Sequence, residues 1–161
     1  MRFAGGANGG RFDRFILVAP QLPHHAPTSR PAAGGWVSVA VPRIVLLSLL
    51  SRFGIDMFGG LTVLAMAVDP LRAAAVGQTT FYSFRMQQNF AAGESYRDDV
   101  RQAPGAVSVF VGGNDEIFRA EQYAPLLMPL RPGLTVTVVP GLTHMEMTVR
   151  PEALDALAAA I

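Results

Sequence analysis

Three short apolar runs, each closed by glycine or proline, constrain the fold of this chain most strongly. They occupy residues 15–19 (FILVA), 106–111 (AVSVFV) and 134–139 (LTVTVV). The first two are almost wholly apolar, as are parallel strands covered on both faces, whereas the third alternates with threonine, as strands at or near a sheet edge do. Because segments of helical periodicity separate these runs, the sequence predicts an α/β fold with about three parallel strands and flanking helices.

The helices are predicted from apolar spacing and from residues that start or stop a helix. Proline is favoured in the first helical turn and glycine just after the last, and a serine hydroxyl can cap the first turn. A proline in the helix interior produces a kink. These signals predict two helices over residues 42–53 and 80–92 and a short third helix that begins at a capping Ser95. A fourth is predicted over residues 117–130, with a kink at Pro125. The last begins at Pro151, with Leu154, Leu157 and Ile161 as its buried stripe.

More than 80 residues separate the first apolar run from the second. That is too many for one crossover helix, so the sequence indicates an inserted segment of about residues 21–79. Segments above the carboxyl ends of a parallel sheet often cover a ligand crevice. We therefore expect the insertion to act as a lid or cap on a single domain.

Composition and charge exclude several kinds of function. The chain is 50% hydrophobic and only 16% charged, which is too apolar for a disordered protein. Its net charge is +1 and its 13 basic residues, all arginine, form no stripe, so nucleic acid is not an expected partner. The absence of cysteine excludes disulfides and thiolate catalysis.

No segment has the length or pattern of a membrane span or an export signal. The longest apolar segment, residues 44–50, is far shorter than the roughly 20 residues of a spanning helix. No signal peptide is visible, so a cytoplasmic location is the default expectation, which the sequence itself does not determine.

An acidic residue and a histidine follow two successive predicted strands. Asp115 comes after the second apolar run and its glycines, and His144 lies 29 residues later, in the loop after the third run. Parallel strands end at the same side of a sheet, so we expect these two side chains to lie close together. A carboxylate that accepts the Nδ1 proton of an imidazole fixes its tautomer, which leaves Nε2 to act as a base.

Other residues compete for these roles. Glu116 is the alternative acid, because it directly follows Asp115. His24 and His25 follow the first predicted strand, but a proline-rich loop accommodates histidines for no chemical reason, and we favour that interpretation. The order acid then histidine matches the last two members of the Ser, Asp, His order of α/β-hydrolases.

At these residues the chain resembles a known family. VFVGGNDEIF (109–118), VTVVPGLTHMEM (136–147) and the terminal helix are similar to the C-terminal part of α/β-hydrolase-fold serine hydrolases of the lysophospholipase-like and serine-aminopeptidase-like branch. The resemblance implies Asp115 as the catalytic acid and His144 as the base, within residues 106–148. It also implies hydrolysis of an ester, thioester or amide of a small or lipid-like acyl substrate through an acyl-enzyme, with no metal or cofactor.

The chain departs from this family in one respect. No G-x-S-x-G motif, which carries the nucleophile and precedes the acid, occurs in the sequence. We therefore interpret residues 1–161 as a partial α/β-hydrolase domain that supplies the acid and the histidine but not the nucleophile, and that is inactive alone. The apolar first strand of such a domain would present a sheet edge capable of self-association. The alternative is a non-catalytic α/β binding or interaction module.

Overall fold

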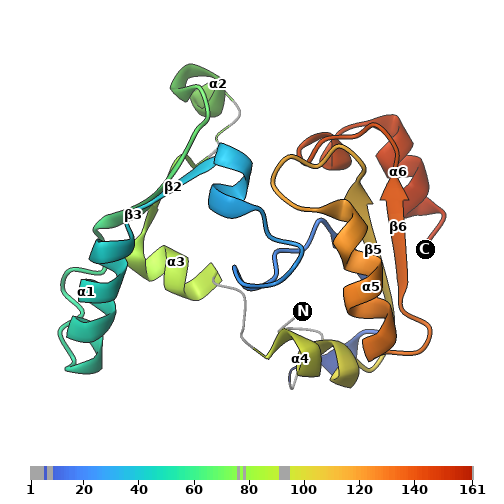
Figure 1. Ribbon diagram of the computed structural model, residues 1–161, viewed down its shortest axis with the longest axis horizontal. Coiled ribbons are helices and arrows are strands. Elements are labelled where there is room, and N and C mark those ends of the chain that lie inside the picture. Colours follow the sequence, from blue (N-terminus) through green and yellow to red (C-terminus); the bar gives the residue numbers. More distant parts are fainter. Residues whose placement is uncertain (1–5, 7–8, 76, 78, 91–94, 161) are drawn as a thin grey trace. The chain divides into compact units, whose positions relative to one another are not determined.

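The computed structural model describes the chain except residues 1–5, 7–8, 76, 78, 91–94 and 161 (Figure 1). The chain divides into two compact units. The first unit comprises Met1–Arg30 and Ala92–Ile161, and the second comprises Pro31–Ala91.

The first unit is built on a three-stranded parallel sheet. Its strands are β1 (Arg14–Val18), β5 (Ala106–Gly112) and β6 (Thr135–Val139), in the order β1-β5-β6. Both pairings are parallel, and each runs through five consecutive residue pairs. The three predicted strands are therefore confirmed, with bounds that differ by one residue.

Burial explains why the middle strand is so apolar. Phe110 belongs to a core cluster that includes Met147 and Ala153, from the segments that follow β6. Val109 and Val111 point to the opposite face, because side chains alternate along a strand, and both are fully buried. The sheet is therefore covered on both faces at β5, whereas β6, with its exposed threonines, lies at an edge of the described sheet.

Short helices connect and cover these strands. The helix α6 (Pro151–Ala158) packs through Ala156 and Leu157 on the cluster around Phe110, and α5 (Tyr123–Leu127) contacts β6 (Figure 1). The remaining helical segments of the unit are η1 (Gly9–Arg11), α4 (Tyr96–Gln102), η3 (Ala120–Gln122), η4 (Met128–Leu130) and η5 (Glu146–Thr148).

Three details of the predicted helices are wrong. The segment 117–130 is not one kinked helix, since α5 is only five residues long and lies between two 3₁₀ turns, which agrees with the disruptive effect of Pro125. Ser95 precedes α4, but its hydroxyl makes no capping bond. In α6 the fully buried residue is Ala153, whereas Leu154 is exposed. Ile161 lies outside the described residues.

The second unit contains an antiparallel sheet that was not predicted. Its strands are β2 (Val37–Val39), β3 (Thr62–Met66) and β4 (Phe81–Ser83), in the order β2-β3-β4. The helix α1 (Val41–Arg52) confirms the predicted helix and packs through Leu47 on Val63 and Phe84. The unit also contains η2 (Pro31–Gly35), α2 (Pro70–Ala75) and α3 (Phe84–Phe90).

The predicted helix over 80–92 is wrong in its first turn. Phe81–Ser83 pairs with β3 instead, because aromatic residues suit a strand that can pack against a neighbour. The Ser83 hydroxyl accepts a hydrogen bond from the Met86 amide at 3.2 Å, which starts α3 after the strand. The end of the predicted helix, residues 91 and 92, lies outside the described residues.

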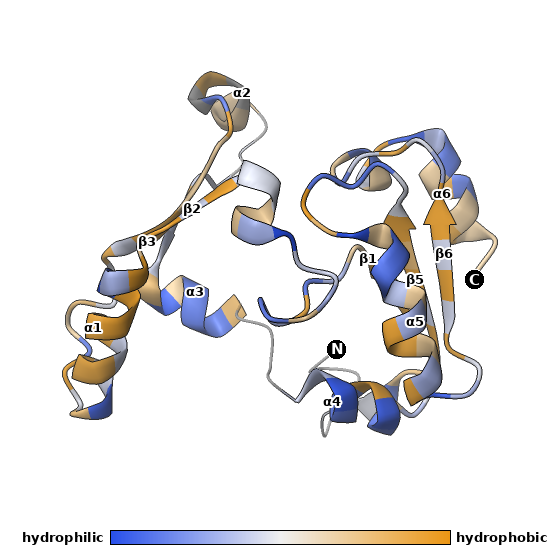
Figure 2. Cartoon of the chain, in the orientation of Figure 1, coloured by the Kyte–Doolittle hydropathy of each residue, from blue (hydrophilic) through white to orange (hydrophobic). Residues whose placement is uncertain are grey.

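The second unit exposes many large apolar side chains. Figure 2 shows α1 as largely hydrophobic, and its side chains Leu46 and Leu49 are exposed, as is Met57 after the helix. Leu50 instead packs on the core of this unit. Across the described residues, no helix has both the length and the apolar character that a membrane span requires.

Candidate functional site

Two loops at the carboxyl ends of β5 and β6 are joined by backbone hydrogen bonds. We call them the acid loop (residues 113–118) and the histidine loop (residues 140–145). The Gly113 amide donates to the Val139 carbonyl at 2.8 Å, and the Asn114 amide donates to the Leu142 carbonyl at 2.9 Å. The Asn114 side chain adds a bond to the Gly141 carbonyl at 3.2 Å. The parallel pairing of β5 and β6 thus continues beyond the strands into both loops.

Glycine permits this close approach. A Cβ atom on Gly112 would lie 2.3 Å from the Leu142 carbonyl oxygen, which is closer than real Cβ contacts. Gly141, in the opposite loop, has a φ of +75°, a conformation that favours glycine. The glycines that mark these turns in the sequence therefore allow the histidine loop to lie directly against the end of β5.

The Asp115 carboxylate is buried and fully bonded. Its Oδ1 accepts hydrogen bonds from the Ile117 amide at 2.9 Å and from the Phe118 amide at 2.7 Å. Its Oδ2 lies 2.9 Å from Nδ1 of His144, and the Asp115 side chain has no exposed surface. Both oxygens are occupied, so the local turn holds the carboxylate in one orientation toward the imidazole.

His144 is held at its side chain and at its backbone. Its amide donates to Oε2 of Glu116 at 3.0 Å, and its ring meets the Phe118 ring at a centroid distance of 5.4 Å in a T-shaped arrangement. Its side chain is 23% exposed. A proton on Nδ1 satisfies the contact with Asp115, and Nε2 makes no hydrogen bond to any residue that the structure describes. Nε2 is therefore the nitrogen left for chemistry.

The turn after His144 is fixed by a second carboxylate. Oε2 of Glu146 accepts hydrogen bonds from the Thr143 amide at 2.9 Å and from the Thr143 hydroxyl at 2.8 Å. The backbone hydrogen bond is the main reason that the pKa of Glu146 lies below its ordinary value. The spacing T-x-x-E is a capping-box signal that the sequence interpretation did not use.

A buried tyrosine lies beside the dyad of Asp115 and His144. Tyr123 has no exposed surface, and its hydroxyl donates to the Pro20 carbonyl at 2.8 Å. Burial, together with the nearby Asp115 carboxylate, raises the pKa of Tyr123 well above its ordinary value. The phenol therefore stays neutral and serves as a hydrogen-bond donor that ties the loop after β1 to α5.

The sequence candidates occupy distinct places. Asp115 and His144 come together as expected, and Glu116 contacts the backbone of His144 rather than its imidazole. His24 and His25 are exposed and meet each other edge to face. Within the described part of the first unit no serine bonds to His144, and no group of three or more metal-binding side chains occurs anywhere among the described residues.

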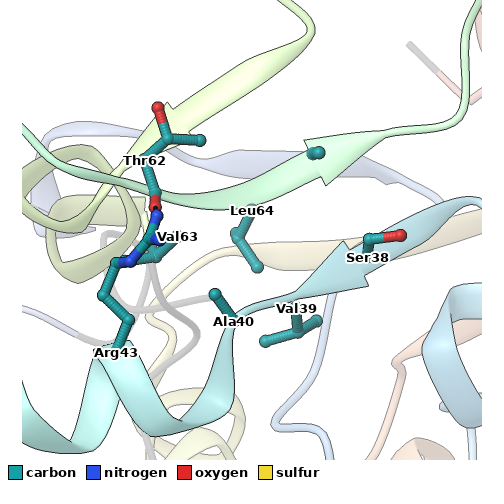
Figure 3. Close-up of a pocket in the computed structure, with 8 residues that line it drawn as sticks. Ser38, Val39, Ala40, Arg43, Thr62, Val63 and Leu64 are labelled. Atoms are coloured by element: carbon teal, nitrogen blue, oxygen red, sulfur yellow. Dashed lines mark hydrogen bonds between the residues drawn. The ribbon is translucent and has the colours of Figure 1, made fainter.

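A groove in the second unit lacks acid–base chemistry. It is lined by Ser38, Val39, Ala40, Arg43 and residues 62–65 (Figure 3). The guanidinium of Arg43 donates to the Thr62 carbonyl at 2.6 Å. The lining contains no carboxylate or histidine, so this groove offers no acid–base pair like that of Asp115 and His144.

Three solved structures with a similar fold are described as a lipase, a carboxylesterase and a hydrolase. The monoacylglycerol lipase of Paleococcus ferrophilus is 16% identical with a TM-score of 0.60, and the alignment covers 99% of this chain and 60% of the lipase. The carboxylesterase CesB of Bacillus subtilis is 13% identical with a TM-score of 0.53, over 98% of this chain and 53% of the esterase. A hydrolase of Pseudomonas aeruginosa PA01 is 16% identical with a TM-score of 0.52, and the alignment covers 98% of this chain and 58% of that hydrolase.

These likenesses establish the fold. The chain contains part of an α/β-hydrolase fold, and it spans a little over half of the length of these three proteins. No known sequence family matches the chain, and no curated protein sequence does so either. The expected fold class is therefore confirmed, while the catalytic roles of Asp115 and His144 stay predictions.

Proposed function

We propose that this chain supplies the acid and the base of a serine hydrolase that acts on ester, thioester or amide bonds. The observation that carries the proposal is the contact of 2.9 Å between a fully buried Asp115 carboxylate and Nδ1 of a partly exposed His144. The hydrolase fold of the similar structures supports the same reaction class.

The proposed reaction uses each group at a defined atom. Nε2 of His144 takes the proton of a serine hydroxyl as its oxygen attacks the acyl carbon, and it then gives that proton to the leaving group. Water then attacks the acyl-enzyme as Nε2 takes its proton, and Nε2 gives that proton to the serine oxygen as the carboxylic acid is released. Asp115 keeps the proton of the neutral ring on Nδ1 and stabilises the imidazolium, because its carboxylate faces that nitrogen.

The serine is proposed to come from outside these 161 residues. None of the seven serines of the sequence lies in a G-x-S-x-G motif. In the first unit, the Ser29 hydroxyl bonds to the Pro23 carbonyl, and that of Ser108 bonds to Thr135 on the adjacent strand. We therefore expect the 161 residues alone to be inactive toward esters and toward fluorophosphonate probes.

The proposed substrate is a small or lipid-like acyl compound. Exposed apolar residues of the second unit, among them Leu46, Leu49 and Met57, are suited to an acyl chain. We propose that the insertion that contains these residues acts as a lid or cap, as the sequence analysis also indicates. Two of the similar structures, a monoacylglycerol lipase and a carboxylesterase, agree with this substrate class.

The test compares the 161-residue chain with the protein translated from its complete reading frame. We expect the complete protein to hydrolyse 4-nitrophenyl butyrate and to be labelled by a fluorophosphonate at one serine, with neither reaction in the 161 residues alone. In the complete protein, His144→Ala should lower kcat by roughly three orders of magnitude or more, since the hydroxyl loses its base.

The matched control replaces an exposed histidine of the same unit, His24→Ala, which should leave hydrolysis near the parent rate. Hydrolysis that survives His144→Ala would contradict the proposal. A complete protein that turns over no ester, thioester or amide would favour the non-catalytic binding module instead.

A further inference from the structure

A second carboxylate of the acid loop holds the same histidine that Asp115 contacts. Asp115 faces the imidazole at 2.9 Å, and the next residue, Glu116, accepts a hydrogen bond from the His144 amide at 3.0 Å. We infer that Glu116 is a positioning residue, which fixes the backbone of His144 so that its ring remains on Asp115. The inference rests on the proposed function, in which His144 is the base.

The need for such an anchor follows from the histidine loop itself. Gly141 has a positive φ, and Met145, next to His144, is half exposed. Leu142 is the one residue of this loop that is buried in the core, so the position of the following segment with His144 depends largely on polar contacts. Two successive amides of this loop are bonded to carboxylates, that of Thr143 to Glu146 and that of His144 to Glu116.

The two carboxylates come from different elements and so hold the loop in different ways. Glu146 belongs to the turn that follows His144, so its bond is local and moves with the loop. Glu116 belongs to the acid loop, so its bond joins His144 to the segment that also presents Asp115. Of these two carboxylates, only Glu116 therefore ties the backbone of His144 to the loop that presents the acid.

The acid loop is rigid enough to serve as this support. The Asp115 carboxylate ties the Ile117 and Phe118 amides to one oxygen, and the backbone on either side of Glu116 is thereby fixed. Asn114 is bonded to the histidine loop through both its amide and its side chain. Glu116 thus extends a continuous line of contacts from β5 to His144.

Glu116 acts here as a hydrogen-bond acceptor for the neutral backbone amide of His144, a role that does not require a negative charge. Glutamine has the same length and retains an acceptor oxygen, whereas alanine retains neither length nor acceptor. The conservative variant Glu116→Gln should therefore preserve the anchor, and Glu116→Ala should remove it. Glu121, an exposed glutamate in η3, provides a control for the loss of one acidic charge.

The first experiment measures the His144 amide and imidazole in the 161-residue chain, so it requires no activity. In Glu116→Ala the His144 amide should exchange with solvent roughly tenfold faster or more, because it loses its hydrogen-bond acceptor. The ¹⁵N signals of the imidazole should show a weakened preference for the Nδ1 proton. Glu116→Gln and Glu121→Ala should retain the parent exchange rate and tautomer, and the amide of the buried Val109 reports that the sheet remains folded.

An unchanged His144 amide and tautomer in Glu116→Ala would overturn the inference, whatever the activity of the protein. The second experiment uses the complete protein, in which Glu116→Ala should lower kcat at least tenfold with little change in KM, and Glu116→Gln should restore it. If the His144 amide responds as expected but the parent complete protein hydrolyses nothing, the proposed function is refuted. Glu116 would then position the backbone of His144 without a role in hydrolysis. The two failures are thus distinguishable.

Discussion

Replacement of Asp115 by alanine should destabilise the chain even where no catalysis is measured. The carboxylate is completely buried and accepts three hydrogen bonds, two of them from the Ile117 and Phe118 amides. Both of those residues are buried, so alanine would leave two backbone donors without their acceptor. A buried unsatisfied donor costs about 1–3 kcal/mol.

Asp115→Ala should therefore lower the free energy of unfolding by about 2–5 kcal/mol. Two amides lose their acceptor, and water that enters the site can satisfy them in part. This loss is a large part of the roughly 5–15 kcal/mol that stabilises a typical domain. Asp115→Asn should cost only about 1 kcal/mol, because its carbonyl oxygen can still accept from both amides. Its amide group then faces Nδ1 and favours a proton on Nε2, the opposite tautomer.

The assay is equilibrium urea unfolding of the 161-residue chain, followed by far-UV circular dichroism. Asp155→Ala is the matched control, since Asp155 is an exposed aspartate on α6, and it should change stability by less than about 0.5 kcal/mol. The ¹⁵N spectrum of His144 reports the tautomer in the asparagine variant. If Asp115→Ala destabilised no more than Asp155→Ala, the assigned role of the buried carboxylate would be wrong.

Two further predictions concern the loops. Gly112→Ala should cost about 1–3 kcal/mol or more in urea unfolding, because its Cβ would meet the Leu142 carbonyl at 2.3 Å, and Gly60→Ala, where space is open, is the control. Glu146→Gln should flatten the acid limb of a stability–pH curve. Since the native pKa of Glu146 is lowered, its contribution is full above its ordinary value of 4.5 and is lost as the pH falls through the lowered pKa. An acid limb identical to that of the parent would disprove this role.

The parallel sheet was predictable because its strands carry a local signal. Residues buried on both faces of a strand must be apolar almost without interruption, and β5 has that composition because Val109, Phe110 and Val111 are all buried. The antiparallel sheet of the second unit was missed. Its strands β2 and β4 are three residues long, and whether Phe81–Ser83 becomes strand or helix depends on pairing with β3, a contact that is distant in sequence.

In the candidate site, the pair of Asp115 and His144 was predictable from the order of elements alone. Each residue directly follows a strand, and parallel strands bring such residues to one edge of the sheet. The choice between Asp115 and Glu116 was not settled by sequence, since both are acidic and adjacent. The structure separates them, because the turn directs one carboxylate to the imidazole and the other to the backbone amide.

The sequence by itself thus determined the periodicity, the apolar strands, the glycines of the two loops and the order of acid and histidine, because each of these depends on neighbouring residues. Only the tertiary structure decided which atoms meet. The contact of Asn114 with Leu142, the T-shaped contact of Phe118 with His144 and the anchor from Glu116 all join segments of the chain that are far apart in sequence. Such contacts form only when β5 and β6 pair in register, which continues the alignment of the strands into the loops that follow them.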